Sequence, residues 1–339
     1  MRSRRNNSRS RAWGVWYSHV PMTRLPGSRL AFALALTIAG SAEAVVSSWH
    51  ENPHSRVRLI TPYAVAAREG PFRLGVEFRL VPGWHAYWRN SGDAGFPPSF
   101  DLRQTPQLES PTIHWPAPQR YALPGDLIAF GYADQVIYAL TAQLRGEADV
   151  LPIAIAVDYL VCAAECVPYR YDLELDQPLG PAAISDLDSA ANLDAWSART
   201  PKPGRADLLS AKIERTGEEY ELIVRYRDPA AKAAVDFFPD SHDLFELGAA
   251  KTATEKDGIA VTIPLTRRSK TAALPNTATF SWVLTGLEDG SAVEFNATPD
   301  LPKSRLRRLG TPAAAGLVAA IAILAARRRR ARARQRLQP

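Results

Sequence analysis

The sequence predicts an all-β fold arranged as two tandem β-sandwich domains. Apolar and polar side chains alternate with a period of two in several segments, which is the pattern of half-buried strands. Turn dipeptides, Asp257-Gly258 and Asp289-Gly290, separate apolar strand patterns. Convincing long helical patterns are missing between the two basic ends of the chain. Short strands at this spacing are typical of a sandwich.

The first domain is expected over residues 45–180, where the clearest strands lie. Residues 72–80 alternate regularly. Residues 150–162 also alternate, and the pattern resumes after Pro168 with polar residues on the opposite face. One apolar face of these two strands carries Leu151, Ile153, Ile155, Val157, Tyr159, Val161, Tyr169, Tyr171, Leu173 and Leu175. Such faces pack into a sandwich core.

A second β-sandwich domain is expected over residues 206–302. Residues 181–205 are rich in Pro, Ala and Ser and are predicted to be a linker, with a short helix near 182–196. Beyond the linker, residues 212–225 predict a hairpin around Thr216-Gly217.

The N-terminal residues 1–44 are predicted to be a signal peptide. Arginines precede an apolar run from Leu30 to Gly40, and Ser41-Ala-Glu-Ala44 follows as a small-x-small cleavage pattern. The alternative is a short N-terminal membrane anchor. Met1 and Met22 are both candidate starts, and Met22 leaves a signal of ordinary length.

A single transmembrane helix is predicted at the other end. Residues 309–326 carry no charge over eighteen positions, which is just long enough to cross a bilayer core. The tail 327–339 holds seven arginines and is expected in the cytoplasm, because positive charge favours that side. The alternative is a basic helix lying on the membrane surface. Both interpretations place the body beside the inner membrane, on its exported side.

The charge distribution argues against a nucleic-acid-binding body. The chain has a net charge of +6, but residues 1–44 contribute +6 and residues 309–339 contribute +7. The intervening 264 residues hold 27 Lys and Arg against 34 Asp and Glu, a balance of −7. A nucleic-acid site needs positive charge spread over a folded face.

The two cysteines, Cys162 and Cys166, carry the sharpest chemical signal. They lie four positions apart between the two best strands, which brings them within disulfide range. A bond that closes so small a loop stabilises little, so a reversible redox pair is one interpretation and a fixed structural clip is the other. A thiolate site for a soft ion such as Cu(I) is a third and weaker interpretation. We expect no metal and no cofactor.

Four ordered motifs resemble the periplasmic N-terminal domain of DsbD-like disulfide reductases, in the branch called suppressor of copper sensitivity protein B. The resemblance covers roughly residues 55–180, and less sharply the second β domain. The motifs are Val157-Asp-Tyr-Leu-Val-Cys162-Ala-Ala-Glu-Cys166-Val-Pro168; Pro82-Gly-Trp-His-Ala-Tyr-Trp-Arg-Asn90 with Gly92-Asp93-Ala-Gly95; Ile113-His-Trp-Pro-Ala-Pro118 with Arg120; and Phe130-Gly-Tyr132 with Val136-Ile-Tyr138.

The resemblance implies an immunoglobulin-like sandwich with a reversible disulfide. Cys166 would form the mixed disulfide and Cys162 would resolve it. A cap over the pair would come from residues 127–132, with Phe130 as the first candidate and Tyr132 as the second. His85 and Tyr87 match positions that line the site in related domains. The implied partners are periplasmic thioredoxin-like or disulfide isomerase proteins.

The chain departs from the full-length reductases, which continue into a polytopic membrane domain and a thioredoxin domain. The sequence has neither, so a membrane electron donor would have to act in trans. A truncated gene and a recruited domain are the other accounts. We therefore expect a periplasmic thiol–disulfide exchange domain that is tethered to the inner membrane. The alternative is a non-enzymatic exported binding module whose disulfide is structural.

Overall fold

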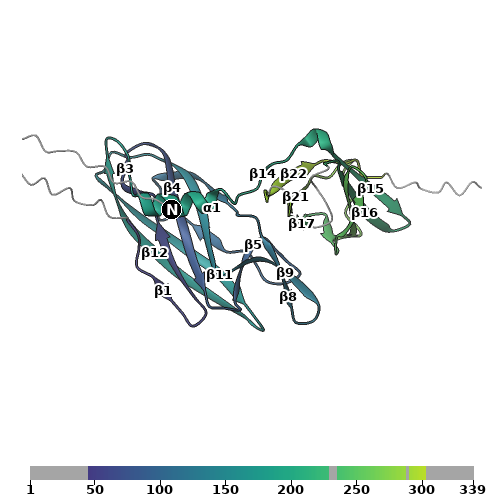
Figure 1. Cartoon of the computed structure of the whole chain (residues 1–339), viewed down its shortest axis with the longest axis horizontal. Coiled ribbons are helices and arrows are strands. Elements are labelled where there is room, and N and C mark those ends of the chain that lie inside the picture. Colours follow the sequence, from purple (N-terminus) through teal and green to yellow (C-terminus); the bar gives the residue numbers. More distant parts are fainter. Residues whose placement is uncertain (1–44, 229–234, 288–289, 303–339) are drawn as a thin grey trace, which may run out of the picture. The chain divides into compact units, whose positions relative to one another are not determined.

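Most of the described residues lie in β-strands, as the alternating pattern predicts. The computed structural model describes residues 45–228, 235–287 and 290–302, which form four sheets and one short α-helix (Figure 1). Within these ranges no helix is both long and apolar enough to cross a membrane. The predicted signal peptide at 1–44, span at 309–326 and tail at 327–339 lie outside the described residues.

The first two sheets hold residues 50–185 and share one core. The five-stranded sheet has the order β1 (His50–Glu51), β2 (Ser55–Ile60), β4 (Gly70–Leu80), β10 (Gln135–Leu144) and β7 (Leu108–His114). The eight-stranded sheet has the order β13 (Ile184–Ser185), β3 (Tyr63–Ala67), β12 (Cys166–Gly180), β11 (Val150–Cys162), β5 (His85–Gly92), β9 (Leu127–Ala133) and β8 (Gln119–Leu123), with β6 (Ser99–Asp101) beside β11.

The predicted alternation of the cysteine-bearing strands is confirmed. β11 and β12 pair antiparallel along their whole length, from Val150 opposite Pro178 to Cys162 opposite Cys166. Ile155 and Val157 on β11 are completely buried. Because apolar residues two apart share a face, the strands bury one side against the five-stranded sheet and leave the polar side outside. This long hairpin places both cysteines at its closed end.

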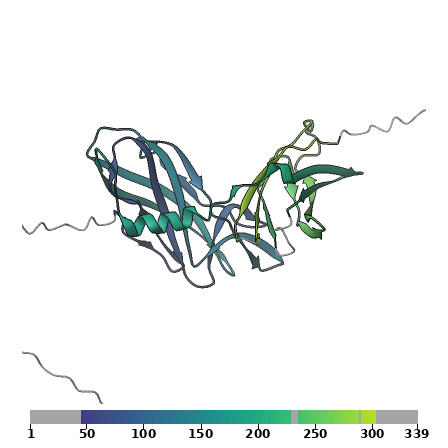
Figure 2. The same cartoon turned by 45° about the horizontal axis from the view of Figure 1, so that its top comes forward.

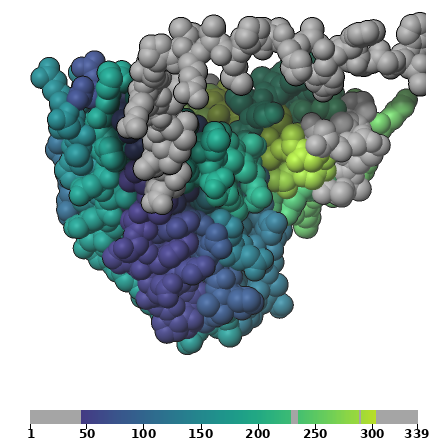
Figure 3. Space-filling model, turned by 60° about the vertical axis from the view of Figure 1, so that its left-hand side comes forward, coloured from purple at the N-terminus to yellow at the C-terminus, as the bar shows by residue number. Residues whose placement is uncertain are grey.

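The stretch predicted as a linker at 181–205 is structured in part. It contains β13 and the helix α1 (Leu187–Ser197), whose first turn is capped by the Asp186 carboxylate accepting from the Ser189 N–H at 2.8 Å. Leu193 is buried against Ile60 and Ile137 of the five-stranded sheet. The helix therefore lies across the strands of that sheet (Figure 2), beside the N-terminal strands drawn in purple (Figure 3).

The other two sheets hold residues 202–297 and share a second core. The four-stranded sheet has the order β14 (Lys202–Pro203), β22 (Val293–Ala297), β21 (Phe280–Thr285) and β17 (Asp236–Pro239). The five-stranded sheet has the order β15 (Leu209–Thr216), β16 (Glu219–Tyr226), β20 (Gly258–Arg267) and β18 (Phe245–Leu247), with β19 (Lys251–Glu255) beside β20 and a short 3₁₀ turn at Ala206–Leu208 before β15. The predicted hairpin around Thr216-Gly217 is the pair β15 and β16.

All described residues belong to one compact unit. β17 of the second sheet pair contacts β9 through Phe238, whose ring packs on Phe130. It contacts β8 through the Phe237 carbonyl, which accepts from Arg120. Arg89 on β5 forms ion pairs with Asp240 and Glu294 at 2.7 and 2.6 Å. Arg120 on β8 forms an ion pair with Asp236 at 2.6 Å. The second sheet pair is therefore fixed to β5 and β8, which also line the region of the disulfide.

Candidate redox site

Cys162 and Cys166 form a disulfide that closes the β11–β12 hairpin. Their Cα atoms are 4.1 Å apart, and the two residues are register partners across the ladder. Cys162 ends β11, Cys166 begins β12, and the Ala163 N–H donates to the Glu165 carbonyl at 2.9 Å within the connection. Two strands joined by so short a connection must bring their ends together. The local sequence alone therefore places the two sulfurs beside each other.

The two sulfurs differ in accessibility. Cys162 is 0% exposed, whereas Cys166 belongs to the exposed class, as does Glu165 before it. Disulfide exchange requires an incoming thiolate to reach one sulfur in line with the bond. The exposed Cys166 meets that requirement, and the buried Cys162 is the sulfur that would leave.

The Tyr87 side chain contacts both sulfurs of the disulfide. Its phenol donates to Cys162 Sγ at 2.9 Å, and its oxygen lies 3.7 Å from Cys166 Sγ. The ring is completely buried, and burial raises the pKa of Tyr87. The phenol therefore keeps its proton at neutral pH. A fixed donor of this kind stabilises negative charge that develops on the leaving Cys162 sulfur.

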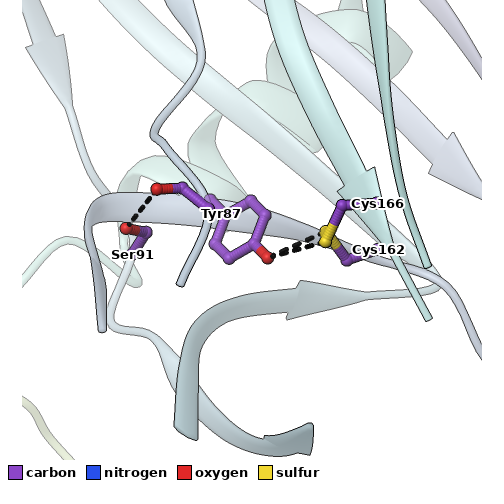
Figure 4. Close-up of a disulfide and its surroundings, with 5 residues drawn as sticks. Tyr87, Ser91, Cys162 and Cys166 are labelled. Carbon is purple, nitrogen blue, oxygen red and sulfur yellow. Dashed lines mark hydrogen bonds between the residues drawn. A yellow bond between two sulfur atoms is a disulfide. The ribbon is translucent and has the colours of Figure 1, made fainter. Parts of the chain in front are cut away.

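The loop after β5 holds the Tyr87 ring against the disulfide (Figure 4). The Ser91 hydroxyl donates to the Gly95 carbonyl at 3.0 Å, and the Asp93 carboxylate accepts from the Ile128 N–H at 2.8 Å. Gly95 has φ +88°, and a Cβ atom there would lie 2.2 Å from Cζ of Tyr87. Glycine is therefore required at 95 both for the backbone conformation and for the space that the ring fills.

We expect Gly95→Ala to destabilise the fold by about 2–4 kcal/mol, because it combines left-handed backbone strain with overpacking against Tyr87. Gly83→Ala is the matched control, since Gly83 has the same φ of +88° but nothing within 4 Å of the added Cβ. Urea unfolding of the two variants separates the two costs. Equal losses of unfolding free energy in Gly95→Ala and Gly83→Ala would show that the Tyr87 ring moves aside freely.

His85 lies on the same face of the sheet as Tyr87. It is the register partner of Cys162, and its ring stacks parallel on Tyr121 at 4.9 Å and meets the Tyr87 ring edge-on at 5.3 Å. The imidazole is buried, and burial lowers the pKa of His85. Its Nε2 atom is buried and has no hydrogen-bond partner among the described residues. Leaving such an atom unpaired costs about 1–3 kcal/mol.

Of the predicted site-lining residues, His85 and Tyr87 lie beside the cysteines, whereas Phe130 and Tyr132 lie in the core. The Phe130 ring packs on Phe238 at 5.2 Å, and the Tyr132 hydroxyl donates to the Pro116 carbonyl at 2.7 Å. Alternation along β9 explains this, because Ala129 and Gly131 face the site while Phe130 and Tyr132 face inward. A cap role for Phe130 or Tyr132 stays a prediction.

Tyr121 and Leu123 on β8 were not predicted as site residues. The cluster of buried residues around Cys162 contains Tyr87, Ala129 and Leu160, and Tyr121 and Leu123 pack against it. Tyr121 pairs with Ala129 across the β8–β9 ladder, which puts its ring over the small residues of β9. The signal in the sequence is the run of small residues at alternate positions, Ala129, Gly131 and Ala133, which leaves room for rings.

The side chains at the site support thiol chemistry. Among the described residues, no group of three or more His, Cys, Asp or Glu side chains is placed to hold a metal ion. The Tyr87 phenol contacts the disulfide, and His85 lies across the ladder from Cys162. These supply a hydrogen-bond donor and a neutral base beside a bond between two sulfurs.

Comparisons with known proteins agree with this site. Residues 56–178 match the family described as "Thiol:disulfide interchange protein DsbD, N-terminal". No curated protein matches the chain at a significant level.

Among solved structures, the N-terminal periplasmic domain of ScsB from Proteus mirabilis is similar over 77% of this chain and 100% of that one, with 21% identity and a TM-score of 0.61. A marsupial T cell receptor covers 73% of the chain at 8% identity and a TM-score of 0.18. The ScsB likeness supports the fold, and the family match spans both cysteines together with His85 and Tyr87. Residues 56–178 of this chain are therefore similar to the N-terminal domain of the DsbD thiol:disulfide interchange family.

Proposed function

We propose that the protein is a periplasmic thiol–disulfide exchange component that carries electrons through Cys162 and Cys166. The observation that supports this best is the asymmetry of the pair. An exposed Cys166 is bonded to a buried Cys162 whose sulfur accepts a hydrogen bond from Tyr87. A structural clip needs neither an accessible sulfur nor a donor aimed at the other one.

The proposed reaction is balanced in two steps. In the reduced protein, the Cys166 thiolate attacks a partner disulfide, so that a mixed disulfide forms and one partner thiolate leaves. The Cys162 thiolate then attacks Cys166 Sγ, which restores the intramolecular disulfide and releases the second partner thiolate. Two electrons pass to the partner, whose two sulfurs take up two protons. Recharging by a donor dithiol runs the same steps in reverse.

The family suggests which partners to propose. The family carries the name of a thiol:disulfide interchange protein, and the similar structure is a periplasmic domain. We propose thioredoxin-like or disulfide isomerase proteins of the periplasm as acceptors and a separate membrane protein as the electron donor. Residues 309–326 would tether the protein to the inner membrane, close to that donor.

The finer architecture belongs to the same proposal. Each pair of sheets would form an immunoglobulin-like sandwich, one over residues 45–180 and the other over residues 206–302. The chain has two cysteines in total, and both lie in the first of these. The second sandwich would therefore serve as a docking or spacing domain.

The reduction potential of the Cys162–Cys166 pair tests the proposal. The purified protein would be equilibrated with glutathione or dithiothreitol buffers of known potential, and the fraction reduced would be read by thiol alkylation and mass spectrometry. We expect a potential between about −180 and −270 mV, where exchange proteins lie.

A potential below about −300 mV, or resistance to reduction in the folded state, would contradict the proposal. The disulfide would then be structural. The protein would be an exported binding module, and its binding would not change when both cysteines are replaced by serine.

A further inference from the structure

Strand pairing places His85 next to the sulfur that has to ionise. Cys162 and His85 are directly opposite each other in the antiparallel pair β11–β5. Side chains of opposite residues lie on one face of a sheet, with their Cβ atoms about 4.5–5.5 Å apart. Tyr87, two residues along β5, lies on that face too and touches Cys162 Sγ. The imidazole and the phenol therefore lie on the face of the sheet that carries the Cys162 sulfur.

The imidazole has an unused nitrogen. His85 is 4% exposed, and its Nε2 atom has no hydrogen-bond partner among the described residues. The His85 ring stacks on Tyr121 and meets the Tyr87 ring edge-on. A phenylalanine ring would make both contacts equally well. Packing therefore accounts for an aromatic ring at position 85 but not for its nitrogen. A buried polar atom without a partner needs an explanation, and a redox or catalytic role is one such explanation.

In the reduced protein Cys162 is a thiol, and its proton has to be removed before the sulfur can attack Cys166. The Cys162 thiol lies in a fully buried position, and a thiol in apolar surroundings ionises poorly without a neighbouring group that accepts its proton. Solvent reaches Cys166 but not Cys162. A base is thus needed at Cys162 for the step that resolves the mixed disulfide.

We propose that His85 is the proton acceptor for the Cys162 thiol during resolution of the mixed disulfide. This proposal rests on the function proposed above. His85 Nε2 takes the proton from Cys162, the resulting thiolate attacks Cys166 Sγ, and the bond between Cys166 and the partner breaks. The electron pair leaves with the partner sulfur. That sulfur then receives a proton, and the imidazolium returns to neutral imidazole.

The surroundings of His85 suit this role. Burial lowers its pKa, so the ring is neutral and able to accept a proton near pH 7. The titratable groups that face it are Cys162 on β11, Tyr87 on β5 and Tyr121 on β8, and burial raises the pKa of both tyrosines. Asp134 raises the pKa of Tyr121 further but does not contribute to the lowered pKa of His85. His85 is then the base of the cluster, and Tyr87 is the donor that steadies the thiolate.

The test follows oxidation of the reduced protein by oxidised glutathione, with quenched-flow and mass spectrometry to separate the mixed disulfide from the closed pair. We expect His85→Phe to slow resolution by about 100-fold or more at pH 7, the range for loss of a general base. The mixed disulfide should accumulate. Because burial lowers the pKa of His85 from its ordinary value, the rate of the wild-type protein should fall only at acidic pH, where His85 becomes protonated, and this inflection should be missing in the variant.

Matched controls keep the outcomes distinct. His114→Gln removes another histidine whose pKa is lowered by burial, on β7 of the other sheet, and should leave the resolution rate and its pH profile unchanged. His85→Phe should remain folded in urea titrations, since it keeps the ring and removes a buried unpaired nitrogen. Equal resolution rates and pH profiles in His85→Phe and wild type would overturn this proposal. No exchange by the wild-type protein would instead overturn the proposed function.

Discussion

Replacement of Cys166 by serine is expected to abolish disulfide exchange, whereas Cys162→Ser should stop the reaction at a stable mixed disulfide. The difference follows from accessibility. Cys166 is exposed and can attack a partner, but Cys162 is completely buried and reaches only Cys166. Incubation of each variant with oxidised glutathione, followed by mass spectrometry without reductant, distinguishes the two results. The wild-type protein should return to the closed disulfide.

Loss of the disulfide should not unfold the protein. The bond joins residues with a separation of 4. The chain-entropy relation gives only about 2 kcal/mol for such a small loop. The first core is formed by residues from both sheets of the pair and does not depend on the bond. Urea unfolding of both serine variants is therefore expected to show cooperative transitions with similar losses, which makes Cys162→Ser the structural control for Cys166→Ser.

Two results would contradict this reading of the pair. Exchange that persists in Cys166→Ser would mean that the buried sulfur is the attacking one. A mixed disulfide of equal yield in both variants would mean that the burial seen for Cys162 does not hold in solution. Either result would remove the basis for assigning different roles to the two cysteines.

The strands that carry the cysteines could be predicted because their signal is local. The alternation at Ile153, Ile155 and Val157 depends only on which face of one strand is buried. The closed hairpin then follows from the short connection between Cys162 and Cys166. The placement of His85 and Tyr87 came from a resemblance, since nothing in the local sequence pairs β5 with β11.

The positions of Phe130 and Tyr121 depend on register, which local patterns do not give. A shift of one residue along β9 exchanges the face that Phe130 occupies, and the register is set by pairing with β5, where Gly131 lies opposite Tyr87. A Cβ atom at Gly131 would lie 1.9 Å from the Ala86 carbonyl oxygen. Because only glycine fits at position 131, this register is fixed and Phe130 points inward. The requirement for glycine can be recognised only in the paired strands, and not in the sequence of β9 alone.

Arg89→Ala is expected to destabilise the protein by about 3 kcal/mol. The guanidinium is bonded to Asp240 through two nitrogens, at 2.7 and 3.0 Å, and to Glu294 at 2.6 Å. Its removal leaves two partly buried carboxylates together without a cation. Breaking a buried ion pair costs about 3–5 kcal/mol, and we take the lower end because the three side chains remain 22–31% exposed.

The loss of stability in Arg89→Ala should grow with pH. Burial raises the pKa of Asp240 and Glu294 raises it further, while Arg89 lowers it. Without Arg89 the folded-state pKa of Asp240 rises further above the unfolded value of about 3.9. A carboxyl group with a raised folded-state pKa favours the fold at low pH, and this contribution is lost as pH rises through that pKa. Urea unfolding of Arg89→Ala should therefore show a larger deficit at about pH 8 than at about pH 4.5.

Two further variants show whether the uncompensated carboxylates are the cause. Arg89→Lys keeps the cation but not the two-pronged contact, so it should lose less than Arg89→Ala. Arg89→Ala combined with Asp240→Asn removes one of the two facing charges and should recover stability relative to Arg89→Ala, with little remaining pH dependence. The Arg89 guanidinium also packs on the Trp88 ring, at 4.5 Å from its centroid. A loss of stability that is independent of pH and unchanged by Asp240→Asn would show that this packing, and not the ion pairs to the second sheet pair, is the cause.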